Sequence, residues 1–229
     1  MPSNVRAIAF DLDNTLWEVE PVLLRAEARL YEWLEAHCPR ITARLNLQDM
    51  RAAREELARR EPHNAHDLTY LRTAALERHA REHGYDPALA HQAFEVFLAA
   101  RCEVQLYPDV LAGLERLRGR FPLATLSNGN ADLTRIGLAP LFAVSLNARQ
   151  LGAAKPAARV FERLAQELAV APQELLYVGD DPQLDAAAAR AAGLRSAWVN
   201  RRGCSWPAAL APPDLAVRDL LELAQALGS

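Results

Sequence analysis

Lysine is almost absent from this sequence. Lys155 is the single lysine among 26 basic residues, and all the others are arginines. This indicates a position that needs a compact ammonium and that a planar guanidinium cannot fill. Cysteine is also scarce: Cys38, Cys102 and Cys204 are too few and too far apart for a disulfide framework or a zinc cluster. We therefore expect a protein of the reducing cytoplasm.

Long apolar runs and an excess of positive charge are missing as well. No run approaches the length of a membrane span, and the apolar stretch before Asp11 is too short for a signal peptide. A net charge of −3 gives no broad attraction to nucleic acid or anionic lipid. The expected partner is a small molecule, with no nucleic acid and no membrane. Nothing in the sequence indicates an oligomeric state.

The apolar pattern changes twice along the 229 residues. The run VRAIAF before Asp11 is typical of a buried strand, whereas from Pro21 to about residue 101 apolar residues recur at helical spacing. After residue 107, helices alternate with the predicted strands PLATLS, FAVSL, ELLYVG and LRSAWV. We expect a doubly wound parallel α/β core, residues 1–16 and 103–229, interrupted by an all-helical domain, residues 17–102.

Polar residues follow three of these predicted strands. Asp11 and Asp13 follow the first, Ser127 and Asn128 end the second, and Asp180 follows ELLYVG with Asp185 five residues later. Ligands of parallel sheets bind beyond the carboxyl ends of the strands, so we expect these groups to meet there. Lys155, before a predicted helix, brings a cation to the same edge.

These groups point to phosphoryl chemistry. Carboxylates gathered without histidine or cysteine are hard ligands that suit Mg²⁺. A hydroxyl, an ammonium and loop amides form a phosphate cradle, and a carboxylate beside it can attack phosphorus. The six histidines all lie between residues 37 and 91, so a second aspartate must act as acid and base. His79 and His83 are one helical turn apart without a third ligand, and we expect them on a solvated helix face.

The motifs DLDNT (11–15), LSNGN (126–130), Lys155 in GAAKP and GDDPQLD (179–185) occur in an order that resembles the haloacid dehalogenase superfamily of phosphatases. The resemblance implies a Rossmann-like core with a helical cap inserted after the first motif. It also implies an Mg²⁺-dependent phosphomonoesterase that forms an aspartyl-phosphate. The stretches DLDNTLWEVEPVLLRAE and SNGNADL resemble the branch that hydrolyses flavin mononucleotide (FMN) and the ribitylaminouracil phosphate of riboflavin synthesis.

By this resemblance each motif residue has a role. Asp11 is the nucleophile and a metal ligand, and Asp13 is the acid and base, with its backbone carbonyl on the metal. Ser127, the Asn128 amide and Thr15 belong to the phosphate site, and Lys155 neutralises charge. Asp180 binds Mg²⁺, while Asp185 acts on it through water or holds Lys155. Asp181 is either a helix cap or close to the metal, and Trp17 either stacks on the substrate or packs beside the cap.

Other functions remain as alternatives. A phosphatase of nucleotides or sugar phosphates fits the same motifs, and a sugar phosphomutase needs the same Asp13. A 2-haloacid dehalogenase would lack Asp13 and the metal, and a phosphonate hydrolase needs a cap lysine that this sequence does not contain. A receiver domain would carry its phospho-acceptor aspartate on a middle strand and its lysine last. A non-catalytic binding protein would be favoured by the loss of a motif residue, and none is lost.

Overall fold

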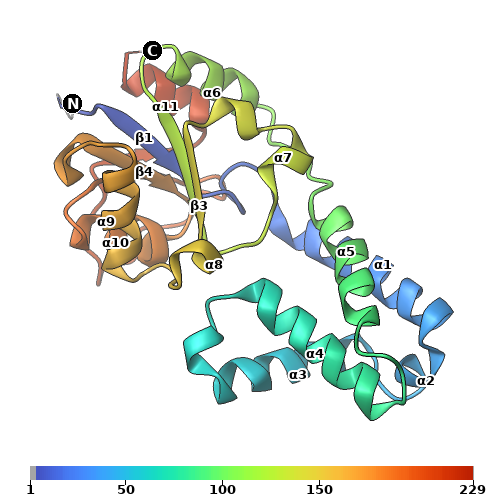
Figure 1. The fold of residues 1–229 in the computed structure, drawn as a ribbon. Helices are drawn as coiled ribbons and strands as arrows, with labels where there is room; N and C mark the ends of the chain where they lie inside the picture. Colours follow the sequence, from blue (N-terminus) through green and yellow to red (C-terminus); the bar gives the residue numbers. More distant parts are fainter. Residues whose placement is uncertain (1–3, 229) are drawn as a thin grey trace. The chain divides into compact units, whose positions relative to one another are not determined.

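The computed structural model describes residues 4–228, which form two compact units (Figure 1). The first unit contains residues 4–18, 105–129 and 137–228, and the second contains residues 19–104 and 130–136. The chain thus changes unit at 18/19 and at 104/105. The chain enters the second unit again for residues 130–136 and continues in the first unit from residue 137.

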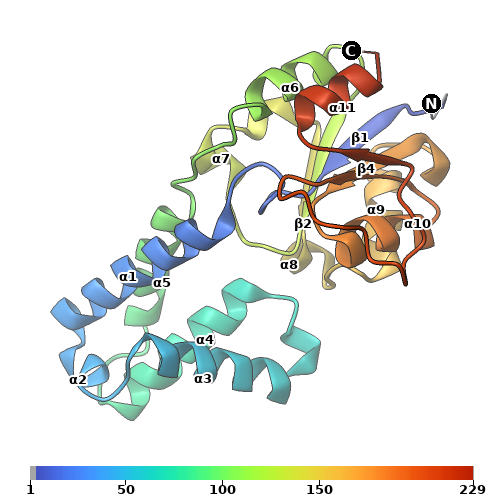
Figure 2. The ribbon, with the colours of Figure 1, turned by 180° about the vertical axis from the view of Figure 1, so that it is seen from behind.

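Six strands in the described chain form one sheet in the order β3-β2-β1-β4-β5-β6, and every neighbouring pair is parallel (Figures 1 and 2). The strands are β1 (Ala7–Phe10), β2 (Leu123–Ser127), β3 (Val144–Asn147), β4 (Leu175–Gly179), β5 (Arg195–Val199) and β6 (Leu215–Val217). The strand order reverses at β1, which lies between β2 and β4. In doubly wound sheets such a reversal opens a crevice beyond the carboxyl ends of the strands.

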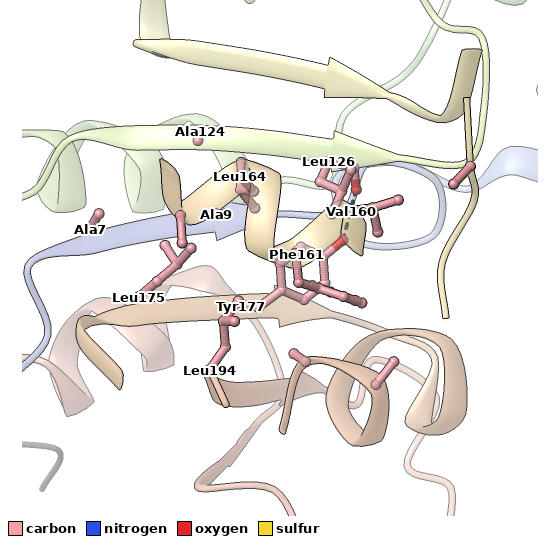
Figure 3. Packing of buried hydrophobic residues seen from close by; sticks show 14 residues of the cluster. Ala7, Ala9, Ala124, Leu126, Val160, Phe161, Leu164, Leu175, Tyr177 and Leu194 are labelled. Atoms are coloured by element: carbon pink, nitrogen blue, oxygen red, sulfur yellow. Dashed lines mark hydrogen bonds between the residues drawn. The ribbon is translucent and has the colours of Figure 1, made fainter. Parts of the chain in front are cut away.

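The central strands are apolar throughout because helices cover both faces of the sheet. Every residue of β1, β2 and β4 is buried. On one face, Tyr177 and Leu126 point toward α9 (Ala158–Glu167), where Phe161 and Leu164 meet them (Figure 3). The short helix α10 (Ala188–Ala191) adds Ala188 and Ala189 to this cluster.

The other face of the sheet is covered by α6 (Val110–Arg118) and α11 (Leu220–Ala226) (Figure 2). These two helices approach closely at Gly113, where an added Cβ would lie 2.5 Å from Leu220 Cβ. The connections contain α8 (Ala148–Leu151), the 3₁₀ turns η2 (Ala139–Leu141) and η3 (Pro172–Glu174), and the π-helical turn η4 (Pro182–Ala187). The turn η4 follows β4 directly and therefore belongs to the edge where the strands end.

The second unit is helical. It consists of α1 (Val19–His37), α2 (Pro39–Thr42), α3 (Leu47–Arg60), the 3₁₀ turn η1 (Pro62–Asn64), α4 (Leu68–Glu82), α5 (Leu89–Arg101) and α7 (Leu133–Ile136). Leu30, Leu34, Met50, Leu76 and Phe97 form part of its core. Asn46 and Asp49 form a capping box that fixes the start of α3. None of the helices within residues 4–228 has the length and apolar character needed to cross a membrane.

The predicted fold class is confirmed, and three details differ. Strand β6 and helix α11 were not predicted, because three strand residues and seven helical residues are too short to give a periodic signal. The helix expected between the predicted strands ELLYVG and LRSAWV begins as the π-helical turn η4. His79 was expected on a solvated face and is instead buried, with 3% of its surface exposed.

Candidate active site

The polar residues that follow β1, β2 and β4 come together because these three strands are neighbours. The backbone N–H of Asp11 donates to the Val178 carbonyl at 2.8 Å, which extends the pairing of β1 with β4 by one residue. Ser127 ends β2, and Asp180 follows the last residue of β4. Loops beyond this edge add the remaining groups, of which Lys155 is the central one.

The ammonium of Lys155 has three oxygen partners. Its Nζ donates to Asp11 Oδ1 at 2.7 Å, to Asp185 Oδ1 at 2.6 Å and to the Tyr177 hydroxyl at 2.9 Å. Tyr177 in turn donates to the Leu126 carbonyl at 2.7 Å (Figure 3). An ammonium has three N–H donors, so the hydrogen-bonding capacity of Lys155 is filled in this arrangement.

Asn128 fixes the backbone of Lys155. Its amide Nδ2 donates to the Lys155 carbonyl at 3.0 Å, and its Oδ1 accepts the Lys155 N–H at 2.8 Å. The peptide bond from Lys155 to Pro156 is cis. This two-way pairing links the loop after β2 to the loop that carries the lysine, so the side chain of Asn128 positions Lys155.

Burial and charge act together on these groups. Burial raises the pKa of Asp11 well above its usual value, against the opposing effect of Lys155. For Lys155 burial lowers the pKa, but the carboxylates of Asp11 and Asp185 outweigh it and hold the pKa well above the usual lysine value. The lysine is therefore an ammonium at neutral pH, and it faces two carboxylates with a single positive charge.

Asp185 occupies the space that a side chain at Gly179 would need. A Cβ on Gly179 would lie 2.2 Å from Asp185 Oδ2. The same Oδ2 accepts the Asp181 N–H at 3.0 Å, while Oδ1 accepts from Lys155. Asp181 uses its own carboxylate to cap η4, accepting from the N–H groups of Gln183 and Leu184 at 2.8 and 2.7 Å. Of the two roles considered for Asp181, the structure shows the helix cap.

Asp180 lies beside this cluster and is held on both sides. Its Oδ1 accepts the Thr15 hydroxyl at 3.3 Å, and its carbonyl accepts the indole N–H of Trp198 at 2.8 Å. Burial, followed by the charge of Asp185, raises the pKa of Asp180 to about 6. Thr15 is fully buried and directed at Asp180, so the structure does not support its predicted contact with phosphate.

Asp11, Asp180 and Asp185 form a group that fits a metal ion. Each offers one carboxylate oxygen, and these three atoms lie within 4.8 Å of one another. Three carboxylates close to one ammonium leave a surplus of negative charge, and hard oxygen donors of this kind suit Mg²⁺. The carboxylate of Asp13 is not part of the group.

Asp13 is held by Trp17. The indole Nε1 of Trp17 donates to Asp13 Oδ1 at 2.9 Å, and Trp17 also forms backbone bridges to Asp13 and Leu106. The Trp17 side chain is completely buried, at 0% exposed. Its ring offers no face to a substrate, so the predicted stacking role is wrong for this structure. The bridge to Leu106 joins the two segments of the first unit next to which the helical insertion leaves and rejoins the core in sequence.

Ser127 provides the hydroxyl at the end of β2. Its Oγ accepts the Gly129 N–H at 2.9 Å, which shapes the loop and leaves the hydroxyl proton free to be donated. The residue is buried at the edge where Asp11 emerges. This placement agrees with the predicted contact between Ser127 and a phosphoryl oxygen, which stays a prediction.

Arg201 supports the loop that carries Asp13. Its guanidinium donates to the Thr15 carbonyl at 3.0 and 2.8 Å and to both oxygens of Asp109 at 2.9 and 3.0 Å. The ring of Tyr107 lies 4.0 Å below the guanidinium carbon. Asp109 also accepts the N–H of Leu220, the first residue of α11. The loop after β1 is thus tied to the loop after β5 and to α11.

Several supporting residues were not predicted from the sequence. Tyr177 carried a signal, since it is the one polar tip in the apolar run LLYVG. Trp198, Arg201 and Asp109 carried none, because their contacts join residues up to 186 positions apart. The structure gathers Asp11, Lys155, Asp180 and Asp185, and it places Asp13 on the loop after β1 and Ser127 at the end of β2.

Comparisons with known proteins agree with this geometry. The family model of the haloacid dehalogenase-like hydrolases matches residues 5–193. The 5-amino-6-(5-phospho-D-ribitylamino)uracil phosphatase YigB of Escherichia coli is 30% identical over 199 residues, covering 85% of this chain and 83% of that protein. The phosphoserine phosphatase of Thermus thermophilus is 41% identical over 154 residues, covering 64% and 61%.

A solved structure shares both the fold and a large part of the sequence. A protein described as a 2-haloacid dehalogenase, from Pseudomonas syringae pv. Tomato, superposes with a TM-score of 0.93 at 36% identity over 98% of both chains. The family match covers most of the chain, and the curated relatives are phosphatases. This chain belongs to the haloacid dehalogenase-like hydrolases and is similar to the phosphatases among them.

Proposed function

We propose that this protein is an Mg²⁺-dependent phosphomonoesterase that acts through an aspartyl-phosphate on Asp11. The observation that carries the proposal is the group of Asp11, Asp180 and Asp185, with three carboxylate oxygens within 4.8 Å of one another. The ammonium of Lys155 pairs with two of these carboxylates, Asp11 and Asp185. In a hydrolase whose nucleophile is water, a side chain at the position of Asp11 would act as a general base. In this proposal the carboxylate of Asp11, directly after β1, is the nucleophile and attacks phosphorus itself.

Asp11, Asp180 and Asp185 would hold the metal, and Asp13 would add its backbone carbonyl. The surplus of carboxylates over cations at this site supports this, because it indicates missing positive charge. When bound, Mg²⁺ supplies neutralisation of the charge between the phosphoryl oxygens and the nucleophile. Every other step falls to side chains of the chain itself.

In the first step an oxygen of Asp11 attacks phosphorus, and the bond from phosphorus to the ester oxygen breaks. Lys155 holds Asp11 and stabilises the charge that develops on the transferring group, and Ser127 donates its hydroxyl proton to a phosphoryl oxygen. Asp13 gives its proton to the departing alkoxide. In the second step Asp13 takes a proton from water, and that water attacks phosphorus and frees Asp11.

Trp17 gives this scheme a positioning residue. Asp13 must act on the leaving group and then on water, so its carboxylate has to stay in one place through both steps. The indole N–H of Trp17, 2.9 Å from Asp13 Oδ1, holds one oxygen of this carboxylate in place. We assign Trp17 this role in place of substrate stacking.

For the substrate we propose a phosphate ester of a ribityl or ribosyl group linked to an aromatic ring, such as FMN or the ribitylaminouracil phosphate. The similarity to YigB over 85% of the chain supports this. So does the resemblance of DLDNTLWEVEPVLLRAE and SNGNADL, at the first and second motifs, to the branch that hydrolyses these esters. Phosphoserine, nucleotides and sugar phosphates are the competing substrates. The presence of Asp13 disfavours dehalogenation, which needs no acid for an alkoxide leaving group.

The test is a panel of substrates assayed with and without Mg²⁺. The panel contains p-nitrophenyl phosphate, FMN, ribitylaminouracil phosphate, phosphoserine, a nucleotide, a sugar phosphate and 2-chloropropionate. We expect Mg²⁺-dependent phosphate release, with the highest kcat/KM for FMN or ribitylaminouracil phosphate. A higher kcat/KM for a sugar phosphate than for FMN and ribitylaminouracil phosphate would contradict the proposed substrate but not the proposed phosphatase activity. Chloride release from 2-chloropropionate without phosphate release from any ester would remove the phosphatase proposal.

A further inference from the structure

A cluster of charged side chains is buried inside the helical unit, where α1, α3 and α4 meet. Glu27 of α1 accepts hydrogen bonds from Arg51 Nε at 2.7 Å and from Arg54 Nη2 at 2.9 Å. Arg72 Nη2 on α4 lies 3.5 Å from the same carboxylate. Three guanidinium groups share one carboxylate, and they have no other ion pair within residues 4–228. The cluster therefore carries excess positive charge.

One member of the cluster, Arg72, and a nearby histidine, His79, have buried polar atoms without hydrogen bonds in the described part of the chain. Arg72 has a side chain that is 10% exposed, and its Nη1 has no hydrogen-bond partner among the described residues. His79, seven residues further along α4, has a side chain that is 4% exposed. Neither of its ring nitrogens has a hydrogen-bond partner in the same part of the chain, and the nearest carboxylate, Glu82 Oε2, lies 3.8 Å from Nδ1. Unpaired polar groups at this depth are costly, so a bound molecule is expected beside them.

The same residues line a small cavity. Arg54, Arg72 and His79 form its polar wall, and Leu30, Met50, Ala75 and Leu76 form its apolar wall. The centre of a water-sized sphere can move within ≈ 10 Å³ of this cavity. The cavity therefore admits one water molecule or one ion of similar size. A polyatomic oxyanion such as phosphate is too large for this space.

We propose that this cavity in the helical unit binds a single halide ion, chloride in the cell, between Arg54, Arg72 and His79. A halide accepts N–H donors from every direction, so it can accept from Arg72 Nη1 and from the one N–H of a neutral imidazole at the same time. It also supplies the negative charge that Glu27 alone does not provide. A water molecule in the cavity could accept the same hydrogen bonds, but it would leave the positive charge uncompensated.

The charges around Arg72 favour a halide over a water molecule in the cavity. Burial, and next the charge of Arg54, lower the pKa of Arg72 to about 9, with Glu27 opposing them. The guanidinium also lies 3.6 Å above the ring of Phe97, which gives a further but weaker attraction. A halide next to Arg72 would add a second full charge of the opposite sign. The site is independent of the proposed phosphatase chemistry, since it involves none of its residues.

The first experiment measures thermal unfolding of the full chain while chloride replaces gluconate at constant ionic strength. A ligand that binds only the folded protein raises the ratio of folded to unfolded molecules about 11-fold at ten times its Kd. We expect a saturable rise in Tm of a few degrees. Arg72→Met should abolish the rise. Arg81→Met, on the same helix with a side chain 59% exposed, is the matched control and should keep it.

The second experiment needs no variant and keeps the proposal testable if Arg72→Met does not fold. Crystals of the wild-type chain grown in sodium bromide are measured at the bromine absorption edge. We expect an anomalous peak within hydrogen-bonding distance of Arg72 Nη1. Density for water alone at this position would overturn the proposal. So would a Tm that is equal in chloride and gluconate, or a chloride effect that is undiminished in Arg72→Met.

Discussion

The indole Nε1 of Trp17 donates a hydrogen bond of 2.9 Å to Oδ1 of Asp13, from a side chain with no exposed surface. The two residues are four positions apart on the loop that follows β1, and their backbones also form a bridge. The ring is therefore a fixed part of the loop. Its N–H determines where the carboxylate of Asp13 lies.

Trp17→Phe should slow the enzyme in a way that depends on the leaving group. A hydrogen bond to a charged acceptor contributes about 1.5–3 kcal/mol, so we expect about a 10- to 100-fold loss in kcat/KM with an alkyl phosphate. With p-nitrophenyl phosphate, whose leaving group needs no proton, kcat/KM should change little, because it reports the first step and not the hydrolysis of the aspartyl-phosphate that both esters share. Trp33→Phe is the control, since Trp33 stacks on His37 in the helical unit. Equal losses on both esters would assign Trp17 a structural role only.

Asp13→Asn should give the same pattern with a larger loss. General acid and base catalysis contributes about 10²–10⁴-fold, and an amide can neither give nor take the proton. The comparison is again made between an alkyl phosphate and p-nitrophenyl phosphate, with kcat/KM for each. A variant that hydrolyses alkyl phosphates at the wild-type rate would show that Asp13 is not the acid.

Lys155→Arg should be inactive although it keeps the positive charge. The ammonium lies 2.6 to 2.9 Å from three oxygen atoms in a buried site, which leaves no room for a planar guanidinium. Loss of a charge-stabilising group at a developing anion costs about 10²–10³ in kcat. Activity and Tm are measured together, so that loss of the fold is recognised. An active and stable Lys155→Arg variant would contradict the claim that the site requires a compact ammonium at this position.

Gly179→Ala should damage the site through Asp185. The added Cβ would lie 2.2 Å from Asp185 Oδ2, so the carboxylate has to move away from Lys155. Overpacking of this kind costs about 1–3 kcal/mol of stability, and we expect weaker Mg²⁺ activation as well. Gly119→Ala is the matched control, because a Cβ there would meet only ordinary contacts at 3.5 Å. If Gly179→Ala depended on Mg²⁺ as the wild type does, the assignment of Asp185 as a metal ligand would be contradicted.

Glu27 should make the stability of the helical unit sensitive to acid. Burial raises its pKa, but Arg51, Arg54 and Arg72 together outweigh this and leave the pKa below its usual value. Because the folded pKa is depressed, its contribution to stability is present above the usual glutamate pKa of about 4.3 and is lost as pH falls through the folded pKa.

Glu27→Gln should remove this acid dependence. It should also destabilise the protein by about 3–5 kcal/mol, since the buried arginines lose their counter-charge. The measurement is the free energy of unfolding between about pH 3 and pH 7, a range that contains the usual glutamate pKa of about 4.3. The same dependence on pH in wild type and variant would contradict the assignment.

The sequence predicted the layers and most of the site for a common reason. Buried parallel strands are apolar along their whole length, so the polar residues that follow them, such as Asp11 and Asp180, mark the edge of the sheet where the strands end. Lys155 was found because arginine had replaced lysine everywhere else.

What the sequence did not reveal depends on pairings between distant segments. The guanidinium of Arg201 reaches the Thr15 carbonyl across 186 positions, and one surface arginine among many gives no sign of that contact. Trp17 and Thr15 were predicted near the substrate because of their place in the motif, whereas packing turned both inward. The burial of His79 likewise depends on how α4 packs and not on the spacing of its residues.

The central claim is that Asp11 is the nucleophile, and the most direct measurement is the rate of p-nitrophenyl phosphate hydrolysis by Asp11→Asn in the presence of Mg²⁺. An amide can replace Asp11 in the fold but cannot form the aspartyl-phosphate. We predict a correctly folded variant with no turnover, alongside a wild-type enzyme whose activity disappears when Mg²⁺ is chelated. A folded Asp11→Asn variant that hydrolyses the ester at the wild-type rate would contradict the claim.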